Sequence, residues 1–179
     1  MAESDIQLSN KKHDFLSLIV EKLSSVLAFA FPLAMAVLIL EVLLRYLFDS
    51  PTIWGHETSI FLCAFSFIWG GLYCVSSDRH IRVVIIYDLL GGHAKVVMDA
   101  VIHFLCVIAC LFFAWASWTM VEKSWWTPAG LMRLETTGSA WNPPSPALLK
   151  GVMLAVMVLM TLQFLIFLIR DLRNLARSK

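Results

Sequence analysis

Charged residues are scarce in this sequence. They make up 15% of its 179 residues, against 59% apolar residues, and the mean hydropathy is +0.77. A soluble domain of this size would aggregate with so apolar a surface, so the composition indicates a protein whose solvent is lipid. The formal net charge of only +1 excludes a strongly basic nucleic-acid-binding protein, which has to neutralise many phosphates at once.

Cysteine and histidine are missing from the positions where membrane redox chemistry would need them. All four cysteines lie inside apolar stretches, so the connecting segments offer no thiol for disulfide exchange. Only His103 lies inside an apolar stretch, whereas a bis-histidine haem needs facing histidines from two helices. We therefore expect no cofactor, no metal site and no enzymatic activity.

Four long apolar runs are present instead. A bilayer core about 30 Å thick requires roughly 20 apolar residues per helical crossing, so each run predicts one transmembrane helix. The sequence predicts an all-α integral membrane protein with four spans, at about 18–44, 57–77, 97–121 and 147–169. A single transmembrane domain over 15–172 would lie between a flexible tail at 1–14 and a basic tail at 173–179. The apolar segment Val83–Leu90 is too short to cross and predicts a short helix along the membrane surface.

The distribution of basic residues predicts that both termini are cytoplasmic. With the N-terminus inside, ten of the fourteen Lys and Arg residues fall on the cytoplasmic side, as the positive-inside rule requires. Tryptophans then gather at the outer ends of the spans, where the indole ring favours the headgroup region. We interpret four of them as membrane-interface anchors: Trp118, Trp125, Trp126 and Trp141.

Several single residues suggest local structure rather than chemistry. Pro32 lies in the middle of the first span and predicts a bend. Glu41 and Arg45 have the i, i+4 spacing and acid-first order of a helical ion pair. Glu57 would lie in the first turn of the second span, where a carboxylate complements the helix dipole. The adjacent Gly70 and Gly71 permit close approach of a neighbouring helix.

Ionisable groups are absent from the middle of the predicted spans. Each lies within about two turns of an interface, where a long side chain reaches water at little cost. A transporter with its own substrate path would be expected to carry buried acids and bases, or paired broken helices at mid-membrane. The residues by themselves therefore predict a membrane scaffold or accessory subunit.

The order of several short motifs is similar to that of a known family. Arg45, Trp54 and Glu57 precede Gly70-Gly71, and Arg79-His80-Ile81-Arg82-Val83 follows in the inner connection. Together with Ser139–Pro144 and Leu162–Asp171, they resemble the small membrane subunit (DctQ-like) of tripartite ATP-independent periplasmic (TRAP) transporters. The resemblance extends from about Phe15 to Leu172.

This resemblance implies a role and a set of partners. It implies an accessory scaffold subunit in the bacterial inner membrane, surrounded by lipid. This subunit would be bound tightly to a large membrane subunit and transiently to a periplasmic substrate-binding protein, and the three would import organic acids with sodium. Arg45, Trp54 and Glu57 would shape the outer connection, and Arg79, His80 and Arg82 the inner one. Two alternatives remain open at this point: a small proton-coupled exporter using Glu41 or Glu57, and a membrane redox subunit using His103 and the histidines of the inner segments.

Overall fold

The computed structural model describes residues 15–77 and 92–177, and most of these are helical. Within these residues lie the helices α2 (Phe15–Leu27), α3 (Ala30–Leu47), α4 (Gly55–Ser76), α6 (Gly92–Trp125) and α7 (Ser145–Arg177). They provide four segments long and apolar enough to cross a membrane, over 17–47, 55–76, 94–125 and 145–176. The predicted all-α membrane fold is thereby confirmed. The orientation of the termini stays a prediction, and the predicted tail at 1–14 and surface helix at Val83–Leu90 lie outside the described residues.

The first span is broken where Pro32 predicts a bend. A proline ring clashes with the carbonyl group four residues earlier, here that of Ala28, and its nitrogen has no hydrogen to donate. The Ala28 carbonyl instead accepts a bond from the Phe31 amide at 3.4 Å. The break between α2 and α3 therefore lies at Ala28 and Phe29, one turn before the proline.

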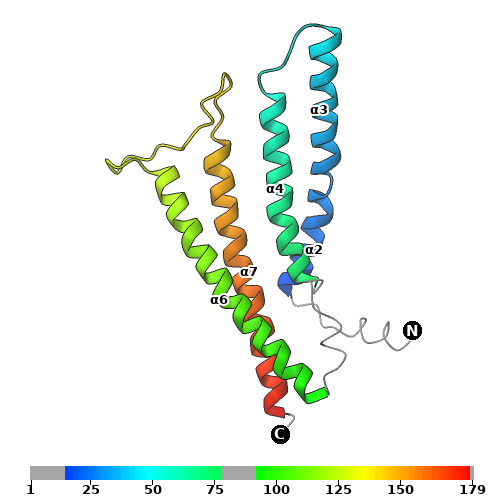
Figure 1. The fold of residues 1–179 in the computed structure, drawn as a ribbon, viewed down its shortest axis with the longest axis vertical. Helices are drawn as coiled ribbons and strands as arrows, with labels where there is room; N and C mark the ends of the chain where they lie inside the picture. Colours follow the sequence, from blue (N-terminus) through cyan, green and yellow to red (C-terminus); the bar gives the residue numbers. More distant parts are fainter. Residues whose placement is uncertain (1–14, 78–91, 178–179) are drawn as a thin grey trace, which may run out of the picture.

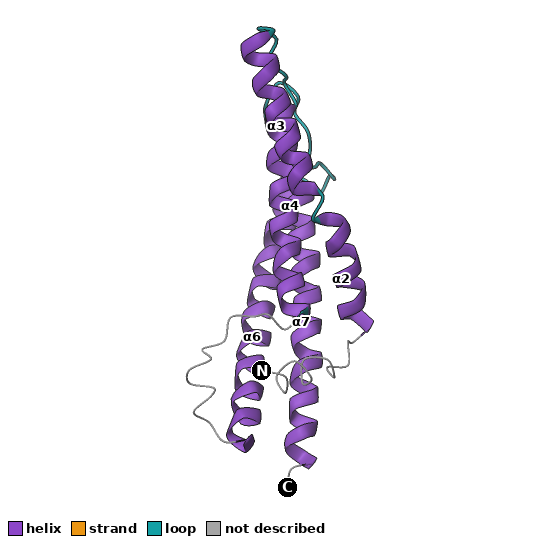
Figure 2. Ribbon diagram, turned by 90° about the vertical axis from the view of Figure 1, so that its right-hand side faces the viewer, coloured by secondary structure: helices purple, strands orange, loops and turns teal. Residues whose placement is uncertain are grey.

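Helices α3, α4, α7 and α6 form one layer rather than a closed bundle. Helix α3 packs on α4, α4 on α7, and α7 on α6, while α2 also packs on α4. Figure 1 shows two hairpins, α3–α4 and α6–α7, that spread apart toward their connecting loops at the same end of the molecule. Figure 2 shows this layer edge on, with α2 standing beside it.

Two small apolar clusters hold the layer together. One joins α2, α4 and α7 through Val20, Leu72 and Val156. The other joins α4, α6 and α7, with Val75 and Phe164 among its members. Only 11% of the most apolar stretch of the first span and 22% of each of the others is buried within the chain. Most apolar side chains are thus left for lipid or for another protein to cover.

Helix α7 is longer than the hydropathy pattern predicts. The predicted span ends at 169, but the helix continues to Arg177 and so extends into the predicted basic tail at 173–179. Hydropathy marks where a segment leaves the apolar layer and not where its backbone hydrogen bonding stops.

Candidate functional site

The connection between α3 and α4 is organised by Glu41. Its carboxylate accepts a bond from Arg45 Nη2 at 2.6 Å, so the predicted pair is present. Its second oxygen accepts the Thr52 amide at 3.0 Å and also the Thr52 hydroxyl, whose oxygen in turn accepts the Gly55 amide at 3.2 Å. Glu41 is only 6% exposed. The sequence indicates the pair with Arg45 but gives no sign that the carboxylate also fixes the following turn.

Trp54 and Glu57 lie at the start of α4, close to this turn. The Trp54 carbonyl accepts bonds from the Thr58 amide at 3.0 Å and the Thr58 hydroxyl at 2.9 Å, which begins the helix. Glu57 lies in the first turn of α4. Both of its carboxylate oxygens also lie 3.3 Å from the hydroxyl of Thr137, in the connection between α6 and α7. Glu57 therefore links the two hairpins as well as complementing the helix dipole.

The long connection from α6 to α7 is fastened to both of its helices by Glu135. This carboxylate accepts the Ser124 hydroxyl of α6 at 2.6 Å and pairs with the Lys150 ammonium of α7. The hydrogen bond from Lys150, and next that from Ser124, hold the pKa of the Glu135 carboxyl below its ordinary value of 4.5. The amide of Glu135 also bonds the Ser124 carbonyl at 2.8 Å.

The predicted tryptophan anchors fall into two groups. Trp125 is half-buried between α6 and α7, where its Nε1 hydrogen is donated to the Ala147 carbonyl at 3.0 Å. A Cβ atom at Gly151 would lie 2.8 Å from Trp125 Cζ2, so the glycine makes room for the indole. Trp125 thus packs two helices together. The other three are more exposed, by 41 to 55%: Trp118, Trp126 and Trp141.

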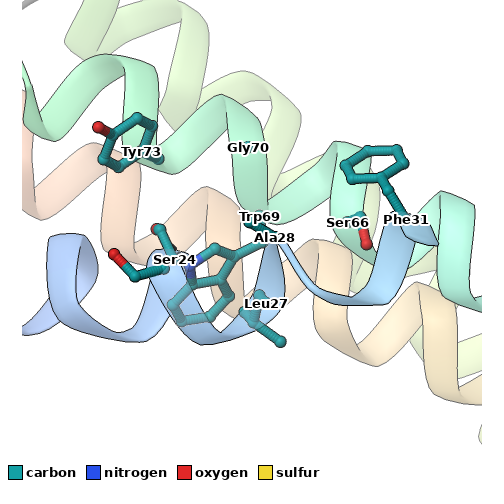
Figure 3. Close-up of a pocket in the computed structure, with 9 residues that line it drawn as sticks. Ser24, Leu27, Ala28, Phe31, Ser66, Trp69, Gly70 and Tyr73 are labelled. Atoms are coloured by element: carbon teal, nitrogen blue, oxygen red, sulfur yellow. Dashed lines mark hydrogen bonds between the residues drawn. The ribbon is translucent and has the colours of Figure 1, made fainter. Parts of the chain in front are cut away.

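A groove of about 280 Å³ opens where the α2–α3 break faces α4 (Figure 3). Trp69 crosses it and donates its Nε1 hydrogen to Ser24 Oγ at 3.0 Å. Gly70 lines the groove, and no atom lies within 4 Å of a Cβ built at Gly70 or at Gly71. The close helix approach predicted for these glycines is therefore not made by the described part of this chain. The volume is at or below the lower limit for small-molecule sites, so the groove suits side chains better than a free solute.

The far half of the layer contains two buried polar pairs that the sequence did not predict. His103 Nδ1 of α6 lies 2.6 Å from Asp171 Oδ2 of α7, with the Phe167 ring 5.5 Å from the imidazole. Gln163 of α7 donates to Ser17 Oγ of α2 at 3.1 Å. The first pair holds the end of α7 against α6. It also commits His103, on which the redox alternative rests, to a bond between helices, which weakens that alternative.

The remaining predicted residues are not placed by the structure. Arg79, His80 and Arg82 lie outside the described residues. Within 15–77 and 92–177 no group of three His, Cys, Asp or Glu side chains could hold a metal ion. What the structure does bring together is one end of the α3–α4 hairpin, where Arg45, Trp54 and Glu57 lie beside the turn.

Comparison with known families gives one match. The family model described as "Tripartite ATP-independent periplasmic transporters, DctQ component" matches residues 34–174. These residues run from the first turns of α3 to near the end of α7. Comparison with curated proteins finds no match.

Proposed function

Since the chain belongs to the DctQ component family of tripartite ATP-independent periplasmic transporters, we propose that it is the stationary scaffold of a three-part importer. As a member of that family it is a multi-pass inner-membrane component of a transporter and not an enzyme. The proposal adds that a large membrane subunit holds the substrate and ion sites. Together with a periplasmic binding protein, the two membrane subunits would import organic acids with sodium.

The positions of the charged side chains support a scaffold rather than a substrate path. Glu41 bonds Arg45 and Thr52 near the outer end of α3, while His103 bonds Asp171 in the opposite half of the layer. A carrier of organic acids needs cationic groups or helix N-termini that face a cavity at mid-membrane. The groove that opens near mid-span is lined by small and aromatic residues and carries no ionisable group apart from the phenol of Tyr73.

The open shape of the layer supports attachment to a second membrane protein. Since α6 packs mainly on α7 and α3 mainly on α4, the two helices at the edges of the layer, α3 and α6, keep broad apolar faces. A domain that moves substrate across the membrane needs a fixed body to move against, and a wide, flat array of helices can provide one. This mechanical role is the core of the proposal.

Two surfaces are the proposed contacts with the large subunit. One is the outer turn region with Arg45, Trp54 and Glu57, where Arg45 is exposed although it is paired. The other is the open face of α4 at Gly70 and Gly71, because small residues let the backbone of a partner helix approach closely in lipid.

Co-purification followed by transport is the decisive experiment. A tagged chain, gently solubilised from its native membrane, should recover one large polytopic membrane protein in stoichiometric amount. Reconstituted with the binding protein, the two membrane subunits should show sodium-dependent uptake of a labelled carboxylate, and omission of this chain should abolish it. Full uptake by the large subunit alone would refute the scaffold role, and recovery of the chain alone would refute the complex.

The role of Glu57 can be separated into a local part and a partner part. Glu57→Lys removes the acceptor for the Thr137 hydroxyl and reverses the charge at the start of α4. Thr137→Val removes this bond, and also the bond of the Thr137 hydroxyl to Ser139 Oγ at 3.0 Å, but keeps the charge of Glu57. If Glu57 contacts the large subunit, Glu57→Lys should lower its recovery at least several-fold while Thr137→Val leaves it unchanged. Equal effects of the two substitutions would leave Glu57 with a purely local role.

A further inference from the structure

A second concave site lies at the outer end of α6, apart from the proposed subunit contacts. This pocket has a volume of about 900 Å³ and is lined by Trp118, Glu122, Lys123, Trp126 and the turn that follows. Unlike the groove at the helix break, it contains one side chain of each charge together with two indole rings. Its composition therefore points to a ligand that is itself both charged and partly apolar.

The wall of this pocket is a well-formed turn. The Thr127 carbonyl accepts the Gly130 amide at 2.9 Å, and the Thr127 amide bonds the Leu131 carbonyl at 2.9 Å. Pro128 and Gly130 occupy the second and fourth positions of the turn, where these residue types are favoured, and Gly130 has φ +76°. A bridge between Trp126 and Met132 closes the turn onto the end of α6. The pocket is thus shaped before any ligand arrives.

Three of the side chains that line the pocket are spaced four residues apart along the sequence. Trp118 and Glu122 are four residues apart along α6, and Trp126 follows four residues later, directly after the helix ends. Residues at this spacing share one helix face, which places Glu122 between the two tryptophans along that face. Indole faces and a carboxylate both attract an ammonium group. Lys123 is the next residue and supplies a cation for a phosphate.

We propose that this pocket binds the headgroup of a zwitterionic phospholipid of the phosphatidylethanolamine type. The ammonium group lies against Glu122 and the indoles, and the phosphate pairs with Lys123. The phosphate of a purely anionic headgroup could also pair with Lys123, but such a headgroup brings no cation to Glu122. Leu131 and Met132, which are 70% and 67% exposed beside the turn, offer apolar surface to the acyl chains. The predicted tryptophan belt already places this end of α6 at headgroup level.

Native mass spectrometry of the purified chain, with whatever subunit remains bound, tests the site. The protein is incubated with equal amounts of palmitoyl-oleoyl phosphatidylethanolamine and phosphatidylglycerol, and the bound lipids are counted. The wild type should retain the ethanolamine lipid preferentially. Glu122→Gln should lower the ratio of the two lipids by about twofold to fivefold, as expected for the loss of one exposed ion pair while both indoles remain. Lys123→Gln should weaken both lipids.

Asp49→Asn is the matched control, because it removes one exposed acid from the other hairpin. It should leave the ratio unchanged. The proposal is overturned if Glu122→Gln leaves the ratio as in the wild type, or if phosphatidylglycerol is preferred. Equally tight binding of glycerophosphoethanolamine, which has the same headgroup without acyl chains, would assign the pocket to a soluble zwitterion and would also overturn it.

Discussion

Replacing Gly151 by alanine should destabilise the protein, although alanine favours helices. The structure allows no methyl group here, because a Cβ at Gly151 would lie 2.8 Å from Cζ2 of Trp125. The indole cannot move away freely, since its Nε1 hydrogen is donated to the Ala147 carbonyl at 3.0 Å. Gly151→Ala must therefore push α6 and α7 apart or break this bond.

The size of the effect follows from comparison with a second glycine. No atom lies within 4 Å of a Cβ built at Gly71, so Gly71→Ala gains only the helix preference of alanine, about 1 kcal/mol at most. This gain is common to both substitutions and cancels in their difference. What remains is the overpacking at Gly151, about 1–3 kcal/mol in tightly packed sites. For a chain of this size that corresponds to a difference in Tm of roughly 2–12 °C.

Thermal unfolding in detergent, followed by intrinsic tryptophan fluorescence, measures this difference. Gly151→Ala should lower Tm, whereas Gly71→Ala should keep or raise it. In a Trp125→Leu background the penalty at Gly151 should disappear, because the clashing ring is gone. The reasoning is refuted if Gly151→Ala raises Tm as much as Gly71→Ala does, or if the penalty persists without Trp125.

Three further predictions concern the polar contacts. Glu41→Ala leaves the Thr52 amide without its acceptor and should cost about 1–3 kcal/mol, seen as faster hydrogen exchange at Thr52 and faster proteolysis within 48–54. Asp171→Leu leaves a buried His103 nitrogen unpaired and should lower the free energy of unfolding by about 1–3 kcal/mol. Adding His103→Phe to the same chain should restore most of this loss. Additive losses in a double-mutant cycle would contradict the pairing. The pKa of Glu135 is lowered in the folded protein, so its contribution to stability is present above the ordinary value of 4.5 and is lost as the pH falls through the lowered value. Protection of the Glu135 amide from exchange should therefore decrease only below about pH 4.5, and Glu135→Gln should show weak protection that does not change with pH.

Features that depend on neighbours along the chain could be predicted from the sequence. Run length and hydropathy gave the four spans, because the thickness of a bilayer fixes how many apolar residues a crossing needs. The ring of Pro32 gave the break between α2 and α3, although the break lies one turn before the proline. The i, i+4 spacing gave the contact of Glu41 with Arg45. In each case the partners are fixed by covalent geometry or by the helix itself.

Contacts between distant segments were decided only by the tertiary structure. Nothing in the sequence around Asp171 indicates its bond with His103, which lies 68 positions away. Trp125 is predicted as an interface anchor, and the structure adds that it packs two helices together. The flat arrangement of the helices was not predicted either. In water an apolar face must be buried, so an amphipathic pattern reveals which side packs inward. In lipid every apolar face of a helix can contact the acyl chains without cost, so hydropathy does not reveal which face packs against a neighbour. The sequence by itself therefore determined which segments cross the membrane. Only steric fit and polar pairs between helices decided which faces meet.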